Sequence, residues 1–242
     1  MAYHFFYAAD LSSSIVTLDA EESTHCIRTM RHRIGDTIVL TDGKGSAAKA
    51  VIASSYPKAC VTQVVDRFSD AETGKQRLHL AIAPTKNADR MEWLVEKAIE
   101  IGVYAITFVC CDHSERTRLN LDRMHRIAVA ALKQSQTLWL PPVEMTNFDE
   151  FMERYGRSEA DKYIAWCDND NTRQFAEERF VHEETIVLVG PEGDFSQREV
   201  ETARRFGYAE VKLGNRRLRT ETAGLYVCMA MAIHPFMRKI IF

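Results

Sequence analysis

Two segments near the C-terminal end of the chain carry residue types that could bind and orient a ligand. The first, Gly190-Pro-Glu-Gly-Asp-Phe-Ser196, follows an apolar run that predicts a buried strand. Its glycines allow the backbone to approach a ligand closely, and the N-terminus of the helix that follows favours polar or anionic groups. The same features also suit an ordinary strand-to-helix turn.

The second segment is Leu213-Gly-Asn-Arg-Arg-Leu-Arg-Thr-Glu-Thr-Ala223. Arginines beside a glycine turn suit the recognition of phosphate or carboxylate, and Thr220 or Glu221 can cap the next helix. Capping with solvated arginines is the alternative interpretation. Neither segment has the glycine fingerprint of a P-loop or a dinucleotide site, which disfavours an unrelated nucleotide-binding protein.

Other candidate sites are weaker. The run Cys110-Cys-Asp-His113 has no second cluster to complete a metal site, and none of the six cysteines has C-x-x-C spacing. The run His182-Glu-Glu184 lacks metalloprotease spacing, and no G-x-S-x-G elbow is present. We therefore expect packing cysteines, a solvated His182 and no metal.

Alternating strands and helices must position the two segments. The sequence predicts strands over 78–83, 105–110, 163–166, 185–189 and 209–213, and helices over 89–101, 119–136, 196–207 and 220–234. The helix predicted at 89–101 ends at Gly102, and Ser196 with Glu199 forms a capping box. This order indicates a mostly parallel α/β sheet with its ligands at the carboxyl ends of the strands.

The first 70 residues have a different pattern. Short β-type runs over 37–41, 47–53 and 59–65 surround a turn at Asp42-Gly-Lys-Gly45, with a short helix over 21–30. Such a pattern favours a small barrel. Residues 70–75 are interpreted as the linker, which gives one domain over 1–70 and a second over 71–242.

Composition and charge limit the class of protein. Apolar residues make up 46% and charged residues 27%, which predicts a globular chain, and the N-terminus lacks the pattern of a signal peptide, so a cytoplasmic location is expected. The net charge is −3, but residues 23–49 and 113–139 are each net +3, while 144–184 are net −7. Local basic patches on an acidic chain suit a localised polyanion site or, alternatively, solvated helix faces.

The two C-terminal segments resemble the paired signature of the SPOUT (α/β-knot) methyltransferases and, more narrowly, the RsmE family of ribosomal RNA methyltransferases. The run over 25–31, Gly35-Asp36 and the turn at 41–45 resemble that family's PUA-like barrel, and residues 86–102 resemble its first SPOUT motif. The resemblance implies a trefoil-knotted, mostly parallel sheet with helices on both faces, after a PUA-like domain. It further implies a homodimer that uses S-adenosylmethionine to methylate N3 of uridine 1498 in 16S ribosomal RNA of the small subunit.

The resemblance also assigns residues. Cofactor binding is implied for Gly190, Pro191, Glu192, Gly193, Leu213, Gly214, Leu218, Arg219, Thr220 and Thr222. Arg219 is the candidate that stabilises negative charge on the uracil, with Glu221 or Glu192 as the proton acceptor. RNA binding is expected at Arg28, Arg31, Arg33, Lys44, Lys86, Arg90 and Arg116.

Four positions at three places depart from the family pattern. Asp194 replaces a glycine, Arg217 replaces an isoleucine, and Gln136-Thr137 replaces Gly-Arg. Two alternatives stay open: a SPOUT enzyme that methylates another RNA atom, such as a ribose 2′-hydroxyl, and a non-catalytic RNA-binding assembly factor.

Overall fold

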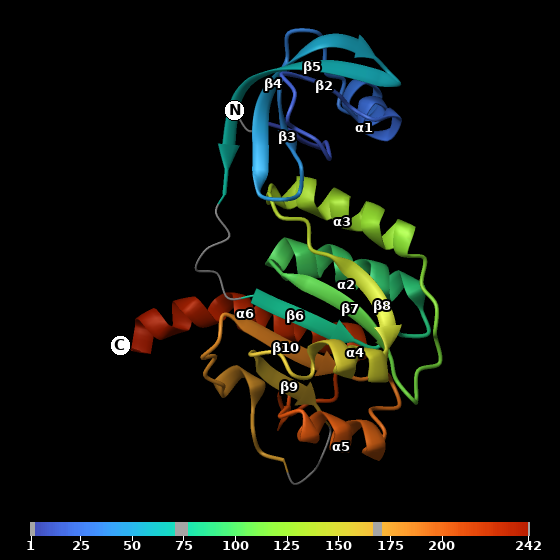
Figure 1. Cartoon of the computed structure of the whole chain (residues 1–242), viewed down its shortest axis with the longest axis vertical. Coiled ribbons are helices and arrows are strands. Elements are labelled where there is room, and N and C mark those ends of the chain that lie inside the picture. The colour runs from blue at the N-terminus through green and yellow to red at the C-terminus, as the bar shows by residue number, and fades with distance from the viewer. Residues whose placement is uncertain (1–2, 71–76, 167–170, 242) are drawn as a thin grey trace. The chain divides into compact units, whose positions relative to one another are not determined.

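The computed structural model describes residues 3–70, 77–166 and 171–241, with side chains up to residue 234. The chain divides into two compact units (Figure 1). Unit 1 comprises residues 1–73 and 129–140, and unit 2 comprises residues 74–128 and 141–242. The chain therefore leaves the first unit, returns to it for twelve residues and leaves again.

Unit 1 is built on a five-stranded sheet in the order β1-β3-β4-β5-β2. The strands are β1 (Phe5–Tyr7), β2 (Ile15–Thr17), β3 (Thr37–Thr41), β4 (Ser46–Tyr56) and β5 (Ala59–Ser69). β1 runs parallel to β3, and the other pairs are antiparallel. Every strand contributes to one buried cluster, including Phe6, Val16, Leu40, Ile52 and Cys60, so the sheet wraps around a single core.

A helical segment and the returning chain complete unit 1. Helix α1 (Ala20–Thr24) is capped by Asp19 and continues as a π-helix, η1 (His25–Thr29). Glu22 of α1 is buried and forms an ion pair with Lys133, which lies in the part of α3 (Leu121–Ser135) that belongs to this unit. Leu138 packs on Val39 of β3. These contacts fix residues 129–140 within unit 1.

Unit 2 contains a six-stranded parallel sheet in the order β11-β9-β10-β6-β7-β8. The strands are β6 (Arg77–Ile82), β7 (Ala105–Cys110), β8 (Val143–Asn147), β9 (Asp161–Ala165), β10 (Glu184–Val189) and β11 (Ala209–Val211). A 3-10 turn, η2 (Phe175–Glu177), lies between β9 and β10. β6, β7 and β10 are almost entirely buried, as expected of strands covered on both faces.

Helices cover both faces of this sheet (Figure 1). On one face α6 (Thr220–Ile241) and α2 (Ala88–Ile101) lie over Leu80 and Ile82; a Cβ on Gly224 of α6 would lie 2.7 Å from Ile82. On the other face α4 (Phe148–Tyr155) and α5 (Gln197–Arg205) pack on Ala81. Neighbouring residues of β6 thus serve opposite faces, which is the two-residue period of a strand.

Most predicted elements of unit 2 are present. β7 has the predicted bounds, and β6, β10 and α2 differ from theirs by one residue. Gly102 ends α2 at φ 107°, and Ser196 and Glu199 form the predicted capping box. The predictions omitted β1, β2, β8 and α4. The mostly parallel sheet with helices on both faces after an N-terminal sheet domain is confirmed.

Candidate functional site

The order of strands in unit 2 predicts where a ligand binds. β6, β7 and β8 extend from the centre of the sheet in one direction, and β10, β9 and β11 extend in the other. The boundary between β6 and β10 is therefore a switch point, and in open α/β sheets ligands bind beyond the carboxyl ends of the strands at such a point. The segments after β6, β10 and β11 all begin at this edge.

The segment after β10 forms a tight loop. Phe195 packs under Gly190, where an added Cβ would lie 3.1 Å from its ring, so a side chain at position 190 would displace the phenylalanine. Asp194 adopts φ 62°, and its Oδ1 accepts a hydrogen bond from the Phe195 N–H at 2.8 Å. Aspartate tolerates the left-handed region better than most residues, which explains how it occupies a position where the family pattern has glycine.

The segment after β7 is hydrogen-bonded to this loop and supports it. His113 Nδ1 donates to the carbonyls of Gly193 and Asp194, at 3.2 and 3.0 Å. The carboxylate of Glu199, fully buried, accepts from the N–H groups of Ser196 and Asp112, each at 2.9 Å. Asp112 and His113 belong to a run that was weighed only as a metal cluster, and no local signal in the sequence identifies them as supports.

The segment after β11 turns at Gly214, which has φ 89° and whose N–H donates to Gln174 at 3.1 Å. The two loops are joined directly, because the Thr220 hydroxyl donates to the Gly190 carbonyl at 3.1 Å. Arg219 is exposed, and no ion pair with it occurs in the described part of the chain. The structure thus brings the two predicted segments together, while nothing in it explains Arg217.

Backbone donors at these loops are unused. Among the described residues, no acceptor takes the N–H groups of Glu192 and Gly193 in the first loop, or of Leu218 and Arg219 in the second. N–H groups at a tight loop and before a helix are suited to bind ligand oxygen or nitrogen acceptors. The site is thus rich in donors held by fixed backbone.

One buried acceptor is also unused. Glu221 is 6% exposed, and its Oε2 has no hydrogen-bond partner within the described residues. Its Oε1 lies 3.6 Å from Nε of Arg90, which stands in the first turn of α2. Buried carboxylates are normally paired, so a buried oxygen that lacks a partner among the described residues indicates a place for a ligand donor. Glu192, by contrast, is exposed, and within the described residues it accepts only from the Lys86 N–H, at 3.3 Å.

The predicted RNA-binding residues of unit 2 have unequal surroundings. Arg116 donates to the carbonyls of Thr85 and Lys86, at 2.6 to 3.1 Å, so it holds the loop after β6 in place. Lys86 is exposed and pairs with Glu115 at 3.0 Å, which raises the pKa of the lysine. Arg90 faces Glu221. A cavity of about 290 Å³ lies over Lys86, Arg116 and Arg118.

The predicted RNA-binding residues of unit 1 fall into two groups. Arg28, Arg31 and Arg33 are exposed in η1 and the loop after it, and no ion pair with them occurs in the described regions. Lys44 stands apart from them on the β3–β4 turn. Gln136, the other departure from a family glycine, has φ 56°.

The remaining candidates do not form a metal site. Cys111 is 8% exposed, and the Cys110 thiol lies 3.8 Å from the Thr117 carbonyl. His182 pairs with Asp161 at 3.1 Å. Within the described residues no three His, Cys, Asp or Glu side chains are placed to hold an ion. Cys167 lies outside them, as do predicted linker residues 71–75.

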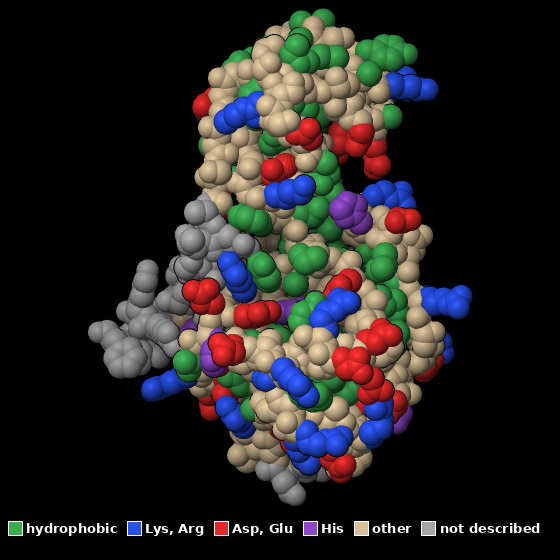
Figure 2. Space-filling view, viewed as in Figure 1, with side chains coloured by type: hydrophobic (Ala, Val, Ile, Leu, Met, Phe, Trp, Pro, Cys, Tyr) green, Lys and Arg blue, Asp and Glu red, His purple; other side chains and the backbone are tan. Residues whose placement is uncertain are grey.

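Charge on unit 2 is mixed. Figure 2 shows acidic and basic side chains interspersed over the face of this unit that is in view. Many are paired, for example Arg198 with Asp112 at 2.9 Å and with Asp149 at 2.7 Å. No helix in the described part of the chain has the length and apolar character needed to cross a membrane.

Two family models match the chain. The model of the RNA methyltransferase domain matches residues 72–232, and that of the RNA methyltransferase PUA domain matches residues 18–65. Among curated relatives, ribosomal RNA small subunit methyltransferase E of Synechocystis is 27% identical over 232 residues, covering 92% of this chain and 75% of the relative. The protein of the same name from Bacillus subtilis is 24% identical and covers 89% of each chain.

Solved structures agree with the family models. A probable rRNA-methyltransferase from Porphyromonas gingivalis is 38% identical, covers 98% of both chains and has a TM-score of 0.84. Ribosomal RNA small subunit methyltransferase E from Neisseria gonorrhoeae, bound to S-adenosyl methionine, is 26% identical, covers 97% of this chain and 98% of its own, and has a TM-score of 0.83. The chain therefore belongs to the RNA methyltransferase family, and its resemblance to the RsmE family is confirmed.

Proposed function

We propose that this protein transfers a methyl group from S-adenosylmethionine to N3 of uridine 1498 in 16S ribosomal RNA. The observation that carries the proposal is the joined pair of loops, with four unused N–H donors and the free buried oxygen of Glu221. Family membership and relatives named as small-subunit RNA methyltransferases support the reaction and the RNA. A ribosomal RNA substrate implies a cytoplasmic location.

The loops fit the cofactor by their donor set. An adenosine joined to an amino acid offers several acceptors to these backbone N–H groups. The predicted cofactor residues, namely Gly190, Pro191, Glu192, Gly193, Leu213, Gly214, Leu218, Arg219, Thr220 and Thr222, all belong to the two loops or the first turn of α6. When bound, S-adenosylmethionine supplies a methyl group on a positively charged sulfur.

The chain's own residues would activate the uracil. N3 of uridine carries a proton and is a weak nucleophile until that proton leaves. Arg219 is exposed beside the loops, and its guanidinium would stabilise the negative charge that develops on the base. Of the two candidate proton acceptors we favour Glu221, because its Oε2 is buried and no described residue donates to it, whereas Glu192 is exposed. Positioning and electrostatics would then supply most of the rate.

Assembly is part of the proposal. The trefoil knot and the homodimer follow from the family resemblance. Exposed apolar side chains on the packed helices α2 and α6, Trp93, Met229 and Ile233, are each 47–48% exposed and offer a surface for a second copy. Sedimentation of the wild type and of Met229→Lys would test the dimer; an unchanged dimer in the variant would exclude this surface.

The direct test is transfer of tritium from labelled S-adenosylmethionine to small ribosomal subunits that lack the modification. Arg219→Ala should keep the calorimetric cofactor affinity within about threefold and lower turnover at least 100-fold, the usual loss for a charge-stabilising group. Arg216→Ala, also exposed in the second loop, is the matched control. Unchanged turnover in Arg219→Ala would exclude its role.

Two other outcomes would change the assignment. Label on a different nucleoside or on a ribose hydroxyl would keep the cofactor site and replace the substrate atom. No transfer to assembled subunits or to free 16S RNA, by protein shown to be folded, would favour the RNA-binding assembly factor.

A further inference from the structure

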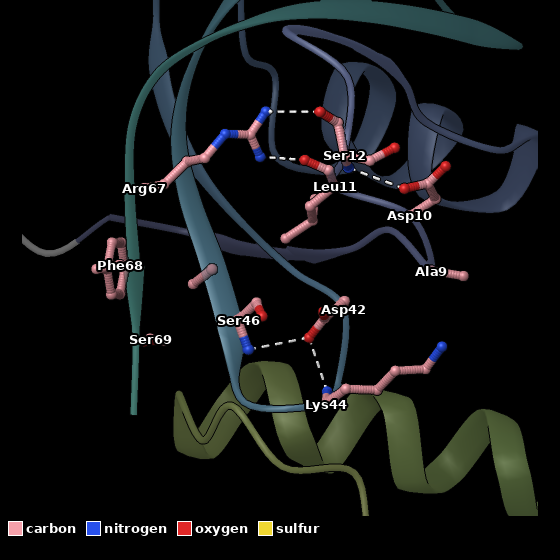
Figure 3. A pocket seen from close by; sticks show the side chains of 11 residues that line it. Ala9, Asp10, Leu11, Ser12, Asp42, Lys44, Ser46, Arg67, Phe68 and Ser69 are labelled. Carbon is pink, nitrogen blue, oxygen red and sulfur yellow. Dashed lines mark hydrogen bonds between the residues drawn. The ribbon is translucent and has the colours of Figure 1, made fainter. Parts of the chain in front are cut away.

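A cavity of about 540 Å³ lies in unit 1, and all of its lining belongs to that unit. Three segments form it: the β1–β2 connection, the β3–β4 turn and the end of β5 (Figure 3). Its volume is within the range of small-molecule sites. None of the residues predicted to bind the cofactor lines this cavity.

The walls of the cavity are fixed by hydrogen bonds. The Arg67 guanidinium on β5 donates to the main-chain carbonyls of Leu11, Ser12 and Ser13, the last at 2.7 Å. Asp42 Oδ1 accepts from the N–H groups of Lys44 and Ser46, at 2.7 and 3.0 Å (Figure 3). An occupant therefore meets a preformed surface, which lowers the entropy lost on binding.

One side of the cavity is aromatic. Phe68 is 40% exposed, and its partner across the strands is the small residue Ala47. Figure 3 shows the Phe68 ring on β5, on the opposite side of the cavity from Lys44 and Asp10. An exposed aromatic ring beside polar groups suits the stacking of a planar base.

The other side carries two opposite charges. Lys44 is exposed, and no ion pair with its amine lies within the described part of the chain. Hydrogen bonds from Ser12, aided by the positive charges of Lys44 and Arg67, hold the pKa of Asp10 below its ordinary value, so its carboxylate stays ionised. An occupant must therefore offer an anionic group to the lysine and N–H donors to the aspartate.

We propose that this cavity binds one nucleotide of single-stranded RNA, with Phe68 on the face of the base, Lys44 on a phosphate and Asp10 on the N–H groups of the base edge. Guanine is the preferred base, because it presents two adjacent N–H groups to a carboxylate. Uracil presents one N–H between two carbonyls, which the carboxylate repels. The proposal rests on the proposed function, since it takes the RNA to be the substrate strand or its flank.

The test measures binding of two fluorescein-labelled hexaribonucleotides to the full chain by fluorescence anisotropy. The guanine probe is GGAGGG, in which one adenine interrupts the guanines, and the uracil probe is UUUUUU. Phe68→Ala should weaken binding of the guanine probe about 5- to 150-fold, the range of one lost base stack, and Phe68→Trp should restore it. Lys44→Ala should lower the slope of log affinity against log salt by about 0.7. Val65→Ala, exposed on the same strand, is the control.

The outcomes separate this proposal from the proposed function. Weaker binding in Phe68→Ala and Lys44→Ala, with the wild type preferring the guanine probe, supports the cavity even if no methyl group is transferred to subunits. Equal binding by wild type, Phe68→Ala and Lys44→Ala overturns it, even if methyl transfer is normal. Preference for the uracil probe overturns the assignment of Asp10. Thermal melting of each variant against Val65→Ala shows that loss of binding is not loss of fold.

Discussion

Glu199 joins the loop after β10 to the segment after β7. Its two carboxylate oxygens accept hydrogen bonds from the N–H groups of Ser196 and Asp112, each at 2.9 Å, and the side chain is fully buried. The Asp112 carboxylate in turn accepts from the Ser196 hydroxyl at 2.6 Å. We therefore predict that Glu199→Ala destabilises the protein and weakens cofactor binding together.

The magnitude follows from the two lost bonds. A hydrogen bond to a charged group contributes about 1.5–3 kcal/mol, so two contribute about 3–6 kcal/mol. Ser196 is half-buried and Asp112 is exposed, so water can hydrogen-bond in part to the N–H groups that the variant leaves without an acceptor. The expected loss of unfolding free energy is therefore about 2–4 kcal/mol. Glu199→Gln keeps one acceptor oxygen without the charge and turns an N–H₂ group toward the other donor, so it should lose more than half as much.

Urea unfolding measures the stability, and calorimetry measures the affinity for S-adenosylmethionine. Glu201→Ala is the matched control, because Glu201 is exposed on the same helix and accepts a hydrogen bond from the side chain of Gln197. A loosened loop should weaken cofactor binding in Glu199→Ala by at least tenfold at a temperature where the variant is folded. A variant as stable as Glu201→Ala, or one with wild-type cofactor affinity, would refute the supporting role.

Three further predictions concern the scaffold. Burial lowers the pKa of His79 from 6.5 to about 4, so the contribution of the neutral imidazole to stability is fully present above pH 6.5 and is lost as the pH falls toward 4. Urea unfolding should show about 2–3 kcal/mol of unfolding free energy lost to this group between pH 7 and 4.5, and His79→Gln should lack that part of the pH dependence. Lys133→Met leaves the Glu22 carboxylate buried without its cation and should lower the free energy of unfolding by about 3 kcal/mol or more. The double variant with Glu22→Gln should recover part of that stability, and equal stability of the single and double variants would contradict a coupled pair. Gln136 adopts φ 56°, so Gln136→Gly should raise stability by up to about 1 kcal/mol, and a loss in thermal melting would show that its side chain contributes more than its strain costs.

Local signals account for the elements that sequence analysis predicted correctly. The capping box at Ser196, the glycine that ends α2 and the apolar runs of β7 and β10 each depend on a few neighbouring residues. The three-residue strands β1 and β2 escaped prediction because so short a segment has no measurable periodicity. β8 and α4 escaped because they lie within the acidic stretch, which hides their pattern.

The remaining features depend on contacts between distant parts of the chain. Arg116, which is predicted to bind RNA, donates to the carbonyls of Thr85 and Lys86 thirty residues earlier, and no sequence pattern indicates this contact. His113 supports a loop eighty residues later, and nothing near it in the sequence distinguishes this role from packing. That Glu221 Oε2 is buried without a partner among the described residues likewise depends on the fold around it, and no neighbouring residue in the sequence indicates it. The sequence singles out the two loops as candidates, and only the folded structure shows the contacts that hold them.

We propose that the joined loops direct methyl transfer to N3 of uridine. The most direct measurement is nucleoside mass spectrometry of 16S RNA from unmodified small subunits, incubated with S-adenosylmethionine and either the wild type or Arg219→Ala. We predict one N3-methyluridine at position 1498 with the wild type and at least 100-fold slower formation with the variant. A methyl group on any other atom, or N3-methyluridine formed equally fast by the variant, would contradict the account.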